Sequence, residues 1–132
     1  MSQKTTLHAV RGAVTIPEDS VECLREELSR LLTMLVTTNH IRENDIVSVF
    51  FTVTPDLNSI SPAQIAREKL SWQNVPMICA QEPDIVGLPS RCIRVLIQFQ
   101  TDQPASTPQH IYLNDATQLR PDWIADGNGG EE

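Results

Sequence analysis

The sequence has few cysteines, and their arrangement excludes two common kinds of site. Cys23, Cys79 and Cys92 are an odd set without the paired, closely spaced cysteines of a zinc site. No secretory signal precedes them. We therefore expect the chain to work in a reducing cytoplasm, with its thiols unpaired.

Histidines and glycine-rich motifs are equally sparse. His8, His40 and His110 are scattered along the chain, and none has the i, i+4 spacing of a helical metal site. The sequence contains no glycine-rich phosphate loop and no nucleophile elbow. Nothing in it favours a metal-dependent mechanism.

Positive charge and long apolar runs are also lacking. The chain has 10 lysines and arginines against 17 acidic residues, a formal charge of -7, so its overall field repels a nucleic-acid backbone. Its apolar runs are far shorter than the roughly 20 residues that cross a bilayer. We expect neither nucleic acid nor membrane as a partner. In so acidic a chain, arginines gathered in one place would serve a small anion.

What is present indicates one folded domain. The 132 residues are 40% hydrophobic and 20% charged, the balance of a globular protein. We place the domain at residues 1–122 and a flexible tail at residues 123–132, which are rich in glycine and acidic residues. A domain of this size keeps much apolar surface near water, so burial between subunits would stabilise it.

Two helices follow from spacing and capping signals. Asp19 and Glu22 have the form of a capping box, and leucines then recur at helical spacing to about Asn39. A shorter helix has Ser61 at its cap and Pro62 in its first turn, with Gln64 completing a second capping box, and runs to about Leu70.

Five strands are predicted from β-branched and alternating segments. They cover residues 7–16, 46–54, 75–81, 92–101 and 110–113, and a turn is expected at residues 87–89. The second strand reads as a buried, central one. In the fourth strand, odd-numbered apolar residues share one face, so Arg94 points to the other. The sum is an α+β domain with a mixed or mainly antiparallel sheet and packed helices.

Four arginines lie in or beside these elements: Arg11, Arg67, Arg94 and Arg120. Arg94 interrupts an apolar strand, and an unpaired buried charge costs several kcal/mol, so it must find an anionic partner. That partner could be a ligand. Equally, Arg94 could form an ion pair with Glu82 or Asp84, or face solvent.

Three other side chains are candidates, and two of them, Glu82 and Tyr112, are expected close to the possible arginine cluster. Glu82 follows an apolar strand and Tyr112 lies within one, so each offers a directional polar group. Cys79 stands in an apolar run, where a cysteine is more often a small buried hydrophobe than a nucleophile. From the residues alone, the conclusion is a candidate site for an organic anion.

Several blocks of sequence, taken together, resemble one known family. They are AVRGA around Arg11, TPDLNSISPAQIARE at 54–68, WQNVPMICAQE at 72–82, CIRVLIQFQTD at 92–102 and IYLNDATQLRPD at 111–122. In this order and register they are similar to the AroH class of monofunctional chorismate mutases.

The resemblance implies a Bacillus-type homotrimer, a pseudo-α/β-barrel with active sites in clefts between subunits. It implies the rearrangement of chorismate to prephenate, in phenylalanine and tyrosine biosynthesis, without a cofactor. Catalytic positions match Arg94, Arg11, Glu82 and Tyr112. Substrate-binding positions match Cys79, Arg67, Leu119, Arg120, Gln64, Ser61, Met77 and Ile78.

Within this resemblance each residue type has a role. Arg94 matches the arginine that faces the ether oxygen and the enolpyruvyl carboxylate, and Arg11 and Tyr112 match its companions at that carboxylate. Glu82 and Cys79 match positions that meet the ring hydroxyl. Arg67, Leu119 and Arg120 match positions at the rim and over the cleft.

The chain departs from the family pattern at the start of the second helix. Ser61 and Gln64 stand where members typically carry an aromatic residue and a lysine, so we expect weaker attraction for the dicarboxylate. Pro83 also follows Glu82 where the family often carries a flexible apolar residue.

Two alternatives compete with the mutase interpretation. Imine and enamine deaminases have a similar trimeric architecture and also clamp a carboxylate with an arginine. A binding module that has lost catalysis is the second alternative, for which the changes at Ser61 and Gln64 would be the sign.

Overall fold

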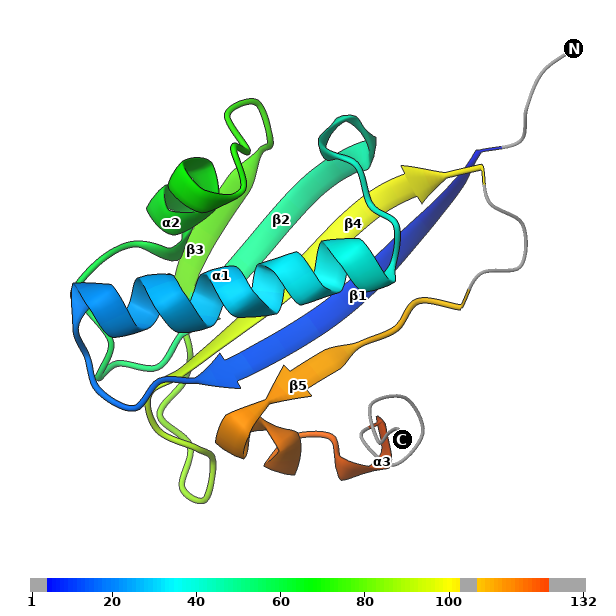
Figure 1. Ribbon diagram of the computed structural model, residues 1–132. Coiled ribbons are helices and arrows are strands. Elements are labelled where there is room, and N and C mark those ends of the chain that lie inside the picture. The colour runs from blue at the N-terminus through cyan, green and yellow to red at the C-terminus, as the bar shows by residue number, and fades with distance from the viewer. Residues whose placement is uncertain (1–4, 103–106, 124–132) are drawn as a thin grey trace, which may run out of the picture.

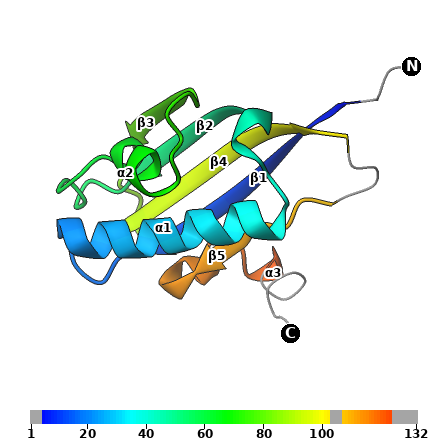
Figure 2. The ribbon, with the colours of Figure 1, turned by 45° about the horizontal axis from the view of Figure 1, so that its top comes forward.

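The computed structural model describes residues 5–102 and 107–123. A mixed sheet is covered on one face by helices α1 (Val21–Thr38) and α2 (Pro62–Lys69), as Figures 1 and 2 show. Short helical turns η1 (Glu43–Asp45), η2 (Asn114–Gln118) and α3 (Pro121–Trp123) join or follow these elements. The expected tail lies outside the described residues except for Trp123, which ends α3.

The sheet has the strand order β3-β2-β4-β1-β5. Its strands are β1 (Thr6–Thr15), β2 (Ile46–Val53), β3 (Met77–Gln81), β4 (Cys92–Thr101) and β5 (Ile111–Leu113). β4 pairs antiparallel with β1 and β2, whereas β1–β5 and β2–β3 are parallel pairs. The predicted α+β fold with a mixed sheet is confirmed. The central strand is β4. β2 has a neighbour on each side but exposes Val47 and Phe50.

The core lies between α1 and the sheet. Five leucines at helical spacing on α1 are fully buried: Leu24, Leu28, Leu31, Leu32 and Leu35. They pack against one face of the sheet, including the predicted row of Ile93, Val95, Ile97 and Phe99. Gly12 permits the closest approach, since a Cβ there would lie 2.7 Å from a Leu35 methyl carbon.

The beginning of α1 differs from the prediction. Ser20, not Asp19, is the N-cap, and its hydroxyl accepts a hydrogen bond from the Cys23 N–H at 3.2 Å. The Asp19 carboxylate instead accepts the N–H groups of Asn58 and Ser59. Both residue types cap helices well, and the contact with this distant loop decides between them.

The N-cap of α2 is as predicted, but the capping box is not. Ser61 accepts the N–H of Ala63 at 3.2 Å, with Pro62 in the first turn. Gln64 donates forward to Glu68 at 3.1 Å, where Arg25 of α1 also donates two hydrogen bonds. Gln64 therefore contributes to the contact between the helices.

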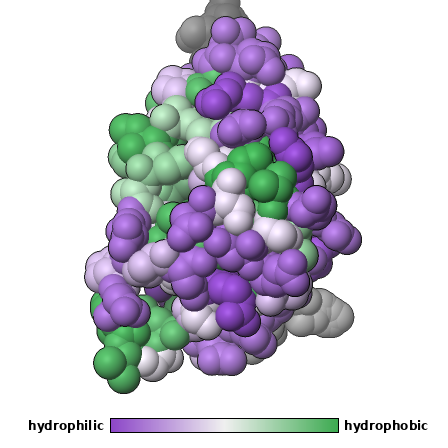
Figure 3. Space-filling view, turned by 90° about the vertical axis from the view of Figure 1, so that its left-hand side faces the viewer, coloured by the Kyte–Doolittle hydropathy of each residue, from purple (hydrophilic) through white to green (hydrophobic). Residues whose placement is uncertain are grey.

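On the face of the sheet away from α1 and α2, η2 covers the part around Ala13 and Tyr112. The rest of this face lacks a covering layer in the described part of the chain. It exposes Phe50 and Ile78, which are 45% and 58% accessible. A second apolar group, Ile85, Val86 and Leu88, projects from the loop between β3 and β4, where Gly87 adopts a φ of +92°. This turn begins at Ile85, two residues earlier than predicted. Figure 3 shows hydrophobic surface along one side of the molecule and at its lower end.

No helix among the described residues combines the length and the apolar character needed to cross a membrane.

Candidate active site

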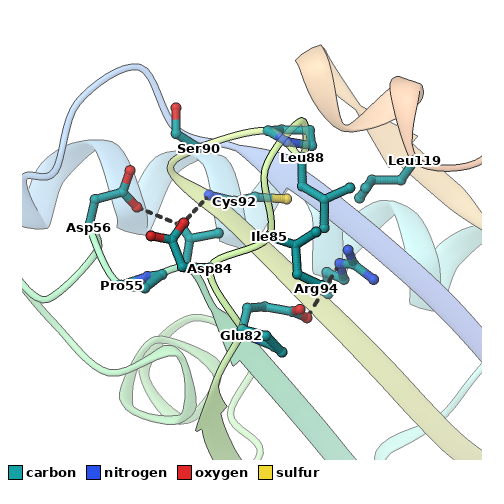
Figure 4. A pocket seen from close by; sticks show the side chains of 13 residues that line it. Pro55, Asp56, Glu82, Asp84, Ile85, Leu88, Ser90, Cys92, Arg94 and Leu119 are labelled. Atoms are coloured by element: carbon teal, nitrogen blue, oxygen red, sulfur yellow. Dashed lines mark hydrogen bonds and ion pairs between the residues drawn. The ribbon is translucent and has the colours of Figure 1, made fainter.

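A pocket of about 180 Å³ opens where β3 ends and β4 begins. Its lining includes Glu82 and Arg94, the apolar loop residues Ile85 and Leu88, and Leu119 from the C-terminal segment. Figure 4 shows these apolar side chains around the guanidinium of Arg94. A charged group thus faces a partly apolar cavity, an arrangement that suits a small organic anion.

Glu82 holds one end of the Arg94 guanidinium. Its Oε2 lies 3.4 Å from Nε of Arg94, and the two side chains are 15% and 28% exposed. The Thr52 hydroxyl donates a hydrogen bond to the same carboxylate. The ion pair weighed from sequence is therefore present. Among the described residues this ion pair engages Nε of Arg94.

The open face of the sheet places Tyr112 level with Arg94. Ala13 of β1 pairs with Arg94 of β4 on one side and with Tyr112 of β5 on the other. Paired residues point to the same face, so all three belong to the face away from α1. Arg11, two residues before Ala13, belongs to this face as well.

Tyr112 lies within a positive field. Its side chain packs with Ala13, Cys92 and Ala116, and burial raises the pKa of the phenol. The charges of Arg11, Arg94 and Arg120 oppose that increase in the pKa of Tyr112. The charges of three arginines thus act on one phenol in a chain of net charge -7, which favours an anionic ligand.

The C-terminal residues of the site are held by a turn against β1. Asn114, at a φ of 59°, donates from its side chain to the Thr15 carbonyl and to Glu27. The next residue's N–H, at Asp115, donates to the Thr15 hydroxyl. Leu119 and Arg120 follow this turn, and Arg120 also pairs with Asp122 at 2.8 Å.

The other predicted residues form a separate cluster beside α2. Cys79 and Ser61 line a different pocket, with Sγ and Oγ 3.7 Å apart. Gln64 and Arg67 are exposed on α2, Met77 packs against the main core, and Ile78 lies on the open face. Cys79 pairs with Phe51 of the core, so it belongs to the helical face, opposite Arg94. One protomer does not bring this cluster to the Arg94 pocket.

The two cysteines near these sites lie in opposite environments. Cys79 is exposed, contrary to the expectation of a buried hydrophobe, because β3 is an edge strand. Cys92 is the buried thiol, and burial raises its pKa to about 11. Cys92 therefore stays protonated at neutral pH and is unsuited to nucleophilic attack.

Two residues of the site were not singled out from sequence. Thr52 binds Glu82, and its signal would have been the pairing of β2 with β4, which places it beside Arg94. His110 accepts a hydrogen bond from the Arg11 backbone at Nδ1, 3.0 Å away. Its only sequence signal is its position two residues before Tyr112.

Comparison with known proteins gives a consistent result. The family described as chorismate mutase type I matches residues 7–123. The chorismate mutase AroH of Bacillus subtilis is 38% identical over 116 residues, 88% of this chain and 91% of that protein. The AroH of Thermus thermophilus is 38% identical over 117 residues, 88% of this chain and 95% of that protein.

A solved structure agrees in fold. A chorismate mutase from Clostridium thermocellum superposes with a TM-score of 0.79 at 36% identity, covering 85% of this chain and 99% of the other. The match along nearly the whole chain excludes the deaminase alternative and confirms the resemblance noted in the sequence. This chain belongs to the type I chorismate mutase family.

Proposed function

We propose that Arg94, Glu82, Arg11 and Tyr112 catalyse the rearrangement of chorismate to prephenate by this chain. The reaction breaks a carbon–oxygen bond and forms a carbon–carbon bond in one concerted step, so neither a nucleophile nor a general base is needed. The observation that carries this assignment is the Arg94 guanidinium, which faces a partly apolar pocket with Glu82 3.4 Å from its Nε.

Arg94 supplies the electrostatic part of catalysis. The ether oxygen of the substrate gains negative charge in the transition state, and a fixed cation beside it stabilises that state more than the ground state. Glu82 and Thr52 fix the guanidinium before the substrate arrives, so little reorganisation is needed during the reaction. In this proposal, the Glu82 carboxylate also accepts a hydrogen bond from the ring hydroxyl of chorismate.

Arg11 and Tyr112 restrict the substrate. Together they would bind the enolpyruvyl carboxylate and hold that arm above the ring, which removes conformational freedom that slows the uncatalysed reaction. Arg120 and Leu119 would cover the cleft from the C-terminal side. The shared action of the three arginines on Tyr112 supports this arrangement.

The assembly we propose is a homotrimer in the cytoplasm with active sites between subunits. The cluster of Ser61, Gln64, Arg67 and Cys79 would then meet the Arg94 pocket of a neighbouring subunit. Three features support this: the two clusters are separate in one protomer, the open sheet face exposes Phe50 and Ile78, and Val86 is 99% exposed beside the pocket. The three unpaired thiols agree with a reducing compartment.

The decisive assay is the disappearance of chorismate on mixing with the purified protein. Arg94→Ala should abolish it, and Arg94→Lys should reduce turnover by about 100-fold or more, because the planar fork of hydrogen-bond donors is lost. Arg42→Ala, which removes an exposed arginine, is the matched control and should leave turnover unchanged. A wild-type protein that binds a transition-state analogue without consuming chorismate would instead be a binding module.

Subunit complementation tests the intersubunit site. Co-expressed Arg94→Ala and Arg67→Ala chains should regain about a quarter of wild-type activity, since random trimers reunite intact residues at that fraction of sites. Co-expressed Arg94→Ala and Glu82→Ala chains should regain none, because both residues come from the same subunit. Equal recovery in the two mixtures would contradict the arrangement.

A further inference from the structure

His110 lies next to the carboxylate-binding arginine but has no role in the mechanism above. Its Nδ1 accepts the backbone N–H of Arg11 at 3.0 Å, in a partly buried contact between residues 99 positions apart. Regular pairing of β1 with β5 starts one residue later, at Gly12 and Ile111. The Arg11 N–H lies just beyond the end of the β1–β5 pairing. It donates to the imidazole where a paired residue would donate to a backbone carbonyl.

We propose that His110 is a positioning residue, which fixes the backbone of Arg11 so that its guanidinium meets the substrate carboxylate. This inference rests on the proposed role of Arg11. An acceptor at Nδ1 requires the imidazole to carry its proton on Nε2, so the neutral tautomer is the one that can act.

The backbone just before His110 is held by the C-cap of α1. Asn39, the C-cap of that helix, accepts the Gln109 N–H at 2.7 Å and donates to the Gln109 carbonyl at 3.0 Å. The same amide donates to the Leu35 carbonyl at 2.9 Å. The residue before His110 is therefore fixed on both sides of its backbone, which gives the histidine a defined position relative to β1.

The charges around His110 favour its acceptor form. Burial and the cations Arg11, on the strand beside it, and Arg120, after η2, lower the pKa of His110. A protonated imidazole would lose the bond to Arg11 and add a third positive charge to this region. At neutral pH the bond is consequently preserved.

The test compares variants that keep or remove the acceptor. His110→Asn places an amide oxygen near the position of Nδ1 and should retain near wild-type kinetics. His110→Leu should raise KM for chorismate about 5- to 30-fold with a smaller effect on kcat, because carboxylate binding is weakened in both ground and transition states. The matched control is His8→Asn in β1, the strand that carries Arg11. The His8 ring stacks on Phe99, and this substitution should not change KM.

A spectroscopic measurement reads the bond directly. In wild type, ¹⁵N NMR should show His110 protonated on Nε2, and exchange of the Arg11 amide with solvent should be slow. Exchange should accelerate in His110→Leu and slow again in His110→Asn. Equal exchange in all three proteins, or no kinetic advantage of asparagine over leucine, would overturn the proposal.

A double-mutant cycle separates this inference from the role of Arg11. If His110 acts through Arg11, His110→Leu should have no further effect on kcat/KM in an Arg11→Ala background. An equal loss in both backgrounds would overturn the positioning role. Near-normal kcat/KM in Arg11→Ala alone would instead contradict the assignment of Arg11, whatever the NMR measurement shows about the bond.

Discussion

Arg94 and Tyr112 lie at the same level of the sheet, two strands apart, because both pair with Ala13. The methyl group of Ala13 is the only side chain between them in that row. The charge and the phenol that we assign to the substrate are therefore separated by one small residue, and a larger side chain would enter the space between them.

Ala13→Val should lower kcat/KM by about 10-fold or more, since overpacking at a filled position displaces neighbouring side chains. Ala13 is fully buried. Ala9→Val, on the same strand and face but exposed, is the matched control and should leave kcat/KM unchanged. Steady-state kinetics of both variants, with thermal unfolding to confirm that they fold, measures the effect. A fully active Ala13→Val enzyme would show that the substrate lies elsewhere.

Thr52→Val should reduce kcat/KM about 3- to 10-fold, because the Glu82 carboxylate loses a hydrogen bond without a change in side-chain shape. Thr52→Ser keeps the hydroxyl and should restore activity. Ser48→Ala is the control: Ser48 lies on β2 with Thr52, and the substitution removes a hydroxyl bonded to Gln98 of β4. Equal kinetics for valine and serine at position 52 would show that Thr52 does not act on Glu82.

Gln64→Lys should lower KM for chorismate several-fold, with less change in kcat, because an added cation attracts the dicarboxylate before and during reaction. High salt should remove most of the gain. Asn74→Lys adds the same charge at another exposed position and controls for a general charge effect. An unchanged KM in Gln64→Lys would show that position 64 is peripheral, or that Glu68 captures the lysine.

Stability should fall on acidification in a manner that depends on His110. The pKa of His110 is lowered on folding, so the unfolded chain binds the proton more readily. Its contribution is complete above the unfolded pKa of about 6.5 and is lost as pH falls through the lower, folded pKa. Urea midpoints between about pH 7.5 and pH 5 should fall less steeply in His110→Asn than in wild type. Parallel slopes would contradict this.

Local patterns predicted most of the secondary structure. Alternation in β4 assigned Arg94 to the face opposite Ile93 and Val95, and leucine spacing gave α1 its buried side. The choice between Asp19 and Ser20 as N-cap failed because a loop far along the chain engages Asp19. Helix-capping propensities describe only neighbouring residues and cannot predict a contact with residues 58 and 59.

Sequence patterns predicted the candidate site less completely than they predicted the fold. The arginines and Glu82 could be identified as candidates from their positions, and the family resemblance assigned a role to each. The exposure of Cys79 depends on β3 being an edge strand, which is a property of strand order and not of the residues around it. The same is true of Thr52 and His110, whose partners come from other strands.

The pairing of β1 with β4 and β5 has a consequence for biosynthesis of the protein. Thr6 lies opposite Thr101, and Arg11 binds His110, so the first strand finds no sheet partner until nearly the whole chain has left the ribosome. Until then, α1 is the element against which the apolar residues of β1 can pack. Such long-range closure makes folding slow relative to a helical bundle. A nascent chain that stops before β4 therefore has neither a completed sheet nor an anion site.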